Sequence, residues 1–82
     1  MGEGWLIDRN RLWVCRFHRD ERAWAREPKV FVDHGRGMPN GAPALLKWRE
    51  HLRREEAVKL WSELVRKGWA PTEPVWGTEV EP

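Results

Sequence analysis

The segment that most constrains the fold runs from Ala44 to Lys67, because it does not fit a single helix. Wound at ~100° per residue, its earlier and its later apolar residues would form two stripes roughly 130° apart. From Leu46 to Leu52 the sequence instead alternates between apolar and charged residues, with Glu50 as the one exception, and alternation is typical of a strand. We therefore predict a strand over about residues 44–51 and an amphipathic helix over about residues 53–67.

Three further strands are predicted before this segment. Residues 4–8 and 12–18 are rich in aromatic and β-branched side chains and are separated by a short polar turn, so they are expected to form a hairpin. Residues 29–33 form a third strand, and residues 74–76, close to prolines, are at most a short edge strand. The sequence thus predicts an α+β fold, in which an antiparallel sheet of three to five strands carries one C-terminal helix across one face.

A chain of 82 residues makes one small domain, here residues 4–77, whose thin core depends on a few large side chains such as the seven tryptophans. Residues 1–3 are predicted to be a disordered N-terminus and residues 78–82 an acidic, frayed tail. No apolar run approaches the ~20 residues that cross a bilayer, and the N-terminus lacks a signal-peptide pattern. The single cysteine suits a reducing compartment. We expect a cytoplasmic protein that does not contact membranes.

The glycine-rich stretch from Val30 to Gly41 has some features of a phosphate-binding loop. Prolines interrupt it, however, no Gly-Lys-Ser/Thr follows, and the next segment is predicted to be a strand, so no helix N-terminus is available for a phosphate. We interpret the stretch as a turn in which Gly35, Gly37 and Asn40-Gly41 take positive φ values.

The candidate catalytic and metal-binding groups do not converge. Asp33 and His34 are neighbours on a strand, so their side chains point to opposite faces. Cys15 shares a strand face with Phe17, which indicates a buried thiol. Cys15 and His18 have the spacing of a zinc-finger pair, but on a strand they also lie on opposite faces. We therefore expect no catalytic residue, no metal and no cofactor, and we expect that the protein is not an enzyme.

Positive charge is concentrated in the first half of the chain. The net charge is only +2, yet residues 9–36 carry eight Lys and Arg against four acidic residues, whereas the last ten residues carry three glutamates and no base. Eleven of the fifteen bases are arginine, which pairs with carboxylate and phosphate groups. A sheet covered by one helix leaves a face open, so some tryptophans are expected to remain exposed as anchors for a partner: Trp5, Trp24, Trp48 and Trp76.

These features predict a non-enzymatic interaction or adaptor module. We expect a protein partner, with self-association included, and the alternative is single-stranded nucleic acid bound by the arginines and aromatic residues of the first half. The candidate binding surface consists of Arg16, Arg19, Arg22, Trp24, Arg26, His34 and Trp48.

Four segments of the chain, "FHRDERAW", "VFVDHG", "LLKWREHLRREEA" and "LWSELVRKGW", follow one another in a distinctive order. In these segments the chain resembles a family of small, tryptophan-rich cyanobacterial proteins catalogued as domain of unknown function 1651, and the likeness covers about residues 4–77. The resemblance implies a defined fold in a cyanobacterial cytoplasm. It brings no catalytic residues and no ligand with it.

Overall fold

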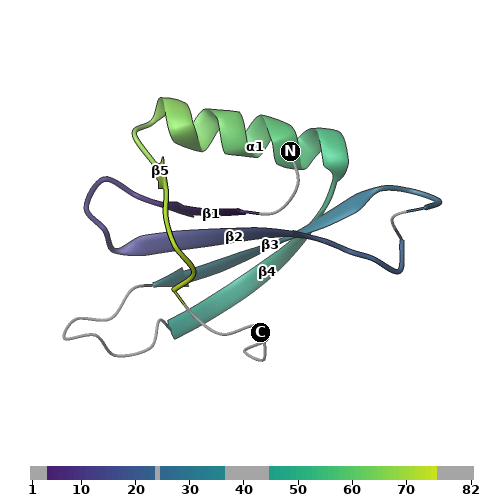
Figure 1. Ribbon diagram of the computed structural model, residues 1–82, viewed down its shortest axis with the longest axis horizontal. Coiled ribbons are helices and arrows are strands. Elements are labelled where there is room, and N and C mark those ends of the chain that lie inside the picture. The colour runs from purple at the N-terminus through teal and green to yellow at the C-terminus, as the bar shows by residue number, and fades with distance from the viewer. Residues whose placement is uncertain (1–3, 24, 37–44, 76–82) are drawn as a thin grey trace.

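The computed structural model describes residues 4–23, 25–36 and 45–75 of the protein. Within them the chain forms one antiparallel sheet with strand order β4-β3-β2-β1-β5, and one helix lies across a face of the sheet (Figure 1). The elements are β1 (Gly4–Ile7), β2 (Trp13–Arg19), β3 (Lys29–Arg36), β4 (Leu45–Arg53), α1 (Arg54–Arg66) and β5 (Ala70–Pro71). The predicted α+β architecture is confirmed.

The chain passes from strand to helix between Arg53 and Arg54, so the predicted division of this segment is confirmed. Arg53 is still extended, with φ −66° and ψ 154°. The sequence offers no Ser, Thr, Asn or Asp as a cap at this point. Instead the Glu56 carboxylate reaches back and accepts a hydrogen bond from the Arg53 backbone N–H at 3.0 Å, which satisfies a donor that the helix leaves unpaired. The same hydrogen bond lowers the pKa of Glu56.

A single aspartate, Asp8, closes the predicted hairpin between β1 and β2. Its carboxylate accepts hydrogen bonds from the backbone N–H groups of Leu12 at 2.7 Å and Trp13 at 3.2 Å. Its carbonyl oxygen accepts a third from Arg11, which takes a positive φ of 59°. Left-handed backbone is uncommon outside glycine, so the three hydrogen bonds to Asp8 help to hold this conformation.

The core lies between the sheet and α1. It consists of Leu6, Cys15, Phe17, Val30, Val32 and Ala57, each at most 2% exposed. Trp61 of the helix packs edge-on against Phe17, with 5.1 Å between the ring centroids. A Cβ atom on Gly4 would come within 2.9 Å of the same indole, so the helix approaches β1 as closely as a glycine permits.

The interpretation of Gly35 as a turn residue with positive φ is wrong. β3 continues past its predicted end at Asp33 as far as Arg36, because β2 and β4 pair with it on both sides. Gly35 is buried within this strand, next to an irregularity in register after His34. Among the described glycines, positive φ occurs at Gly68, which follows the C-cap residue Lys67 of α1, with a value of 105°.

The fifth strand also differs in position from the prediction. It is formed by Ala70 and Pro71, which pair with β1, whereas Pro74 and Val75 lie outside any strand. Pro71 is tolerated because β5 is an edge strand. Some predicted features lie outside the described residues: the ends at 1–3 and 78–82, the turn positions Gly37 and Asn40-Gly41, and Trp24 and Trp76. No helix in the described part of the chain is long and apolar enough to cross a membrane.

Candidate functional site

The face of the sheet opposite α1, termed the open face below, carries polar and aromatic side chains. Strand register arranges them in two transverse rows. The first row is Trp5, Arg16, Asp33 and Arg49, and the second is His18, Phe31 and His51. These residues alternate along the strands with those of the core, so the same strands that bury the apolar side chains also position this layer.

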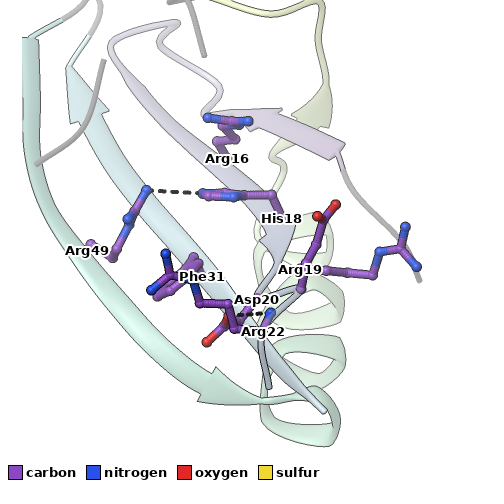
Figure 2. A pocket seen from close by; sticks show the side chains of 8 residues that line it. Arg16, His18, Arg19, Asp20, Arg22, Phe31 and Arg49 are labelled. Carbon is purple, nitrogen blue, oxygen red and sulfur yellow. Dashed lines mark hydrogen bonds between the residues drawn. The ribbon is translucent and has the colours of Figure 1, made fainter. Parts of the chain in front are cut away.

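A concavity of about 630 Å³ lies on the open face, over β2, β3, β4 and the turn that follows β2 (Figure 2). Its lining residues are Arg16, His18, Arg19, Asp20, Glu21, Arg22, Phe31 and Arg49. The lining holds four arginines and two carboxylates. The buried Asp33 compensates the charge of Arg49, and the net positive charge that remains favours anionic ligands. Figure 2 shows the arginines distributed around the concavity, an arrangement that suits an extended ligand with several negative charges.

Asp33 is the centre of the polar layer and is fully buried. Arg49 donates to its two oxygens through Nε at 2.5 Å and Nη2 at 2.9 Å, and His18 Nε2 lies 2.8 Å from Oδ2. Burial alone would raise the pKa of this carboxyl, but the hydrogen bonds and charges of Arg49 and His18 outweigh it and lower the pKa to about 2. Arg49 Nη2 also lies 3.3 Å from His18 Nε2 (dashed in Figure 2), because both atoms bind the same carboxylate oxygen.

Phe31 is in contact with two side chains of β4. The Arg49 guanidinium lies over its ring at 4.4 Å from the centroid, and the His51 ring stacks on it at 4.6 Å and 20°. His51 in turn lies 2.9 Å from the Asp20 carboxylate through Nε2. These contacts hold the ring in place and occupy ring surface that a nucleobase would need for stacking.

Arg16 has a hydrogen-bond donor that the fold does not use. It lies directly across from Asp33 in the strand register, but Arg49 and His18 already bind both oxygens of that carboxylate. The Arg16 guanidinium instead lies over the Trp5 ring, 5.6 Å from the centroid. Its Nη1 is buried without a hydrogen-bond partner among the described residues, although buried donors are nearly always paired. Arg16 also lines the concavity, so its positive charge would attract an anionic group there.

The structure divides the predicted binding residues between two surfaces. Arg16, Arg19 and Arg22 line the concavity together. Arg26 is exposed in the β2–β3 connection and does not line it, and Trp24 lies outside the described residues. The sequence prediction missed Arg49, Phe31 and His18, because they reach the concavity only through the register of three strands. The alternation of charged and apolar residues along β4 could have indicated that Arg49 lies on the open face.

His34 and Trp48 lie on the other face, beyond the area that α1 covers. Their rings stack at 4.5 Å and 11°, and Trp48 remains 48% exposed. His34 Nε2 lies 2.6 Å from the Glu50 carboxylate, and its Nδ1 lies 3.3 Å from Cys15 Sγ. Four tryptophans were expected to be exposed. Trp48 is exposed and Trp5 is half-buried, and the other two lie outside the described residues.

Cys15, His34 and Glu50 follow one another in the order of a nucleophile, a base and an orienting carboxylate. Cys15 is only 2% exposed, however, and burial, together with the charge of Glu50, raises the pKa of its thiol to about 12. The thiolate is the nucleophile, so this thiol stays protonated and out of reach of a substrate at neutral pH. Asp33 and His34 point to opposite faces, as predicted.

No group of three or more His, Cys, Asp or Glu side chains in the described ranges is arranged to hold a metal ion. Comparison with known proteins adds a family and no activity. No curated protein and no solved structure matches the chain. One family profile does match, over residues 3–76, and its description is "Protein of unknown function (DUF1651)". Since this match spans nearly the whole sequence, the chain belongs to the DUF1651 family.

Proposed function

We propose that this protein is a non-enzymatic interaction module that binds an acidic segment of a partner protein in the concavity of its open face. The observation that carries the proposal is the concavity itself, whose lining holds four arginines, among them Arg16, against two carboxylates. A carboxylate placed there would accept charge-assisted hydrogen bonds, which are stronger than neutral ones. The spread of the arginines favours a ligand with several such groups.

Two observations favour a protein segment over single-stranded nucleic acid. Asp20 and Glu21 stand among the arginines, so the surface is of mixed charge, and it would repel a continuous phosphate backbone in places. Phe31, the aromatic residue of the lining, already contacts Arg49 and His51, whereas single-strand binding depends on free ring faces. Nucleic acid is the alternative outcome of the test.

The test compares a fluorescently labelled glutamate-rich peptide with a single-stranded DNA of equal charge, by fluorescence anisotropy at low and at physiological salt. The informative variant combines Arg16→Gln, Arg19→Gln and Arg22→Gln. The control combines Arg26→Gln, Arg54→Gln and Arg66→Gln, which removes the same charge at exposed positions outside the concavity. Three pairs worth about 0.5 kcal/mol each correspond to about a tenfold loss of peptide affinity in the first variant.

We expect the control variant to bind the peptide within about twofold of the wild type, apart from the general loss of charge. Tighter binding of the DNA than of the peptide at both salt concentrations would replace the protein partner with nucleic acid. Equal losses in the two triple variants would show that net charge alone attracts the peptide, and the concavity would then have no binding role.

A further inference from the structure

All three histidines of the chain lie within hydrogen-bond distance of a carboxylate. On the open face, His18 Nε2 lies 2.8 Å from Asp33 Oδ2, and His51 Nε2 lies 2.9 Å from an oxygen of Asp20. His34 has its carboxylate partner on the other face. Histidine ordinarily changes its charge between about pH 5 and 8. The open face therefore carries two groups whose charge depends on pH, and the other face carries a matching control.

His18 itself lines the concavity, with a side chain that is 13% exposed. It lies 3.3 Å from Arg49 Nη2, and both groups bind Asp33 Oδ2. Because Arg49 already binds both oxygens of Asp33, this carboxylate cannot compensate a second full positive charge. A proton on His18 therefore makes the lining more positive. The other charged side chains of the lining are Arg16, Arg19, Asp20, Glu21 and Arg22.

His51 acts on the concavity through Asp20, the first residue after β2. Asp20 is one of the two carboxylates of the lining, and its side chain is 14% exposed. Its Oδ1 accepts a hydrogen bond from the Arg22 backbone N–H at 3.1 Å, and its Oδ2 faces His51. With a neutral His51, the negative charge of Asp20 repels an anionic ligand, whereas a protonated His51 compensates that charge. The other charged side chains near His51 on this face are paired, Lys29 with Glu27 and Arg53 with Glu56.

Two protons are a large change relative to the charge of the concavity. Four arginines against Asp20, Glu21 and the buried Asp33 leave one net positive charge while the histidines are neutral. Protons on both histidines raise this net charge from one to three. The glutamates of a ligand have an ordinary pKa of about 4.3 and stay ionised down to about pH 6. The attraction between the concavity and an acidic segment therefore increases as the pH falls.

We infer that the module binds its acidic partner segment in a pH-dependent way, because protonation of His18 and His51 increases the affinity of the concavity for carboxylates. The inference rests on the proposed function, since the ligand is the same acidic segment, and it adds the regulation of that site. One additional exposed ion pair raises affinity by a factor of about three. The two histidines together should therefore raise the affinity about 5- to 10-fold between about pH 8 and pH 6.

The first experiment measures the affinity of the labelled glutamate-rich peptide by fluorescence anisotropy from about pH 8 to pH 6 at constant ionic strength. The wild type should bind about 5- to 10-fold more tightly at the lower pH. His18→Gln/His51→Gln keeps a hydrogen-bond donor at both positions but takes up no proton, so its affinity should vary by less than about twofold. The control His34→Gln should retain the full pH dependence. His51→Gln alone, at an exposed position, should lose about half of the dependence on a logarithmic scale, and it provides the test if the double variant does not fold.

The second experiment is isothermal titration calorimetry of the same peptide in buffers of different ionisation enthalpy. A proton that strengthens binding must be taken up when the peptide binds. At about pH 7 the wild type should take up roughly 0.5 proton per peptide, and the double variant should take up none.

Two kinds of failure are distinguishable. Binding to the wild type that does not change with pH, or an equal pH dependence in His18→Gln/His51→Gln, would overturn the inference and leave the proposed function intact. Loss of the dependence in His34→Gln would overturn it as well, because the effect would then come from the other face. If the peptide binds at no pH, the proposed function itself fails, and the inference fails with it.

Discussion

The two faces of this sheet are stabilised in different ways, although the same strands build both. Towards α1, Phe17 and Val32 pack in an apolar core that excludes water. On the open face, their neighbours Arg16 and Asp33 belong to a layer of charged and aromatic groups. The first face gains stability from every apolar side chain that it buries. The second has to compensate for the desolvation of a fully buried carboxylate.

This difference indicates where to look for function. A hydrophobic pair in place of Asp33 and Arg49 would often serve stability as well or better, so stability alone does not account for the ionic layer. The layer does hold Arg49 and Phe31 in fixed positions beside the concavity. It also occupies the carboxylate that would otherwise pair with Arg16. These fixed positions support the proposal that the open face binds a ligand.

The largest expected effect distinguishes the two faces through their phenylalanines. Phe17→Ala removes a ring with no exposed surface that packs against Trp61, and we expect it to lower the free energy of unfolding by about 3–5 kcal/mol. Phe31→Ala, on the open face, removes a half-buried ring and should cost about 1–2 kcal/mol. Urea unfolding followed by circular dichroism measures both values. Equal losses would mean that the open face contributes to the core as much as the covered face does.

The next effect compares the carboxylates that pair with histidine on each face. Asp33→Asn leaves the partly buried side chains of Arg49 and His18 without their negative partner, and we expect a loss of about 2–3 kcal/mol in the free energy of unfolding. Glu50→Gln changes the matching pair with His34, but Glu50 is 41% exposed, so the loss should stay below about 1 kcal/mol. A larger loss for Glu50→Gln would place the more important ionic pair on the helix side.

Much of the covered face could be predicted from the sequence, and little of the open face could. The change from strand to helix before Arg54 was predictable, because two apolar stripes so far apart exclude one helix. The end of β3 was not, since pairing on both sides carries Gly35 through a position that its residue type assigns to a turn. Arg16, Arg19 and Arg22 are close together in the sequence, and this local cluster identified part of the concavity.

The rest of the site depends on strand register, which no local pattern encodes. Arg49 reaches the concavity only because β4 pairs with β3 so that Asp33 lies opposite it. That register changes at the irregularity after His34. The burial of Asp33 was unexpected for a similar reason. A carboxylate in a strand is normally solvated, and its two partners come from other strands.

The pH dependence of stability offers a smaller effect on the same face. The pKa of Asp33 is about 2 in the folded protein, below its ordinary value of 3.8. Its contribution is therefore complete above about pH 4 and is lost as the pH falls towards 2, since the unfolded chain takes up the proton first. The loss should reach about 2 kcal/mol. The difference between the wild type and Asp33→Asn, measured by urea unfolding from pH 5 to about pH 2, isolates this residue. A constant difference across this range would show that Asp33 is not held ionised.

The smallest expected change in stability belongs to Arg16, and it completes the comparison of the faces. Arg16→Met removes a buried donor without a partner, which relieves a desolvation cost of about 1–3 kcal/mol. It also removes the contact with Trp5, worth about 0.5–1 kcal/mol. The free energy of unfolding should therefore stay constant or rise by about 1 kcal/mol, while affinity for the acidic peptide falls.

Trp48→Ala, on the other face, should leave that affinity within about twofold, because Trp48 lies on the side of the sheet away from the concavity. A marked loss of stability in Arg16→Met would show that Nη1 has a structural partner, and a loss of peptide affinity in Trp48→Ala would extend the binding surface to the helix side.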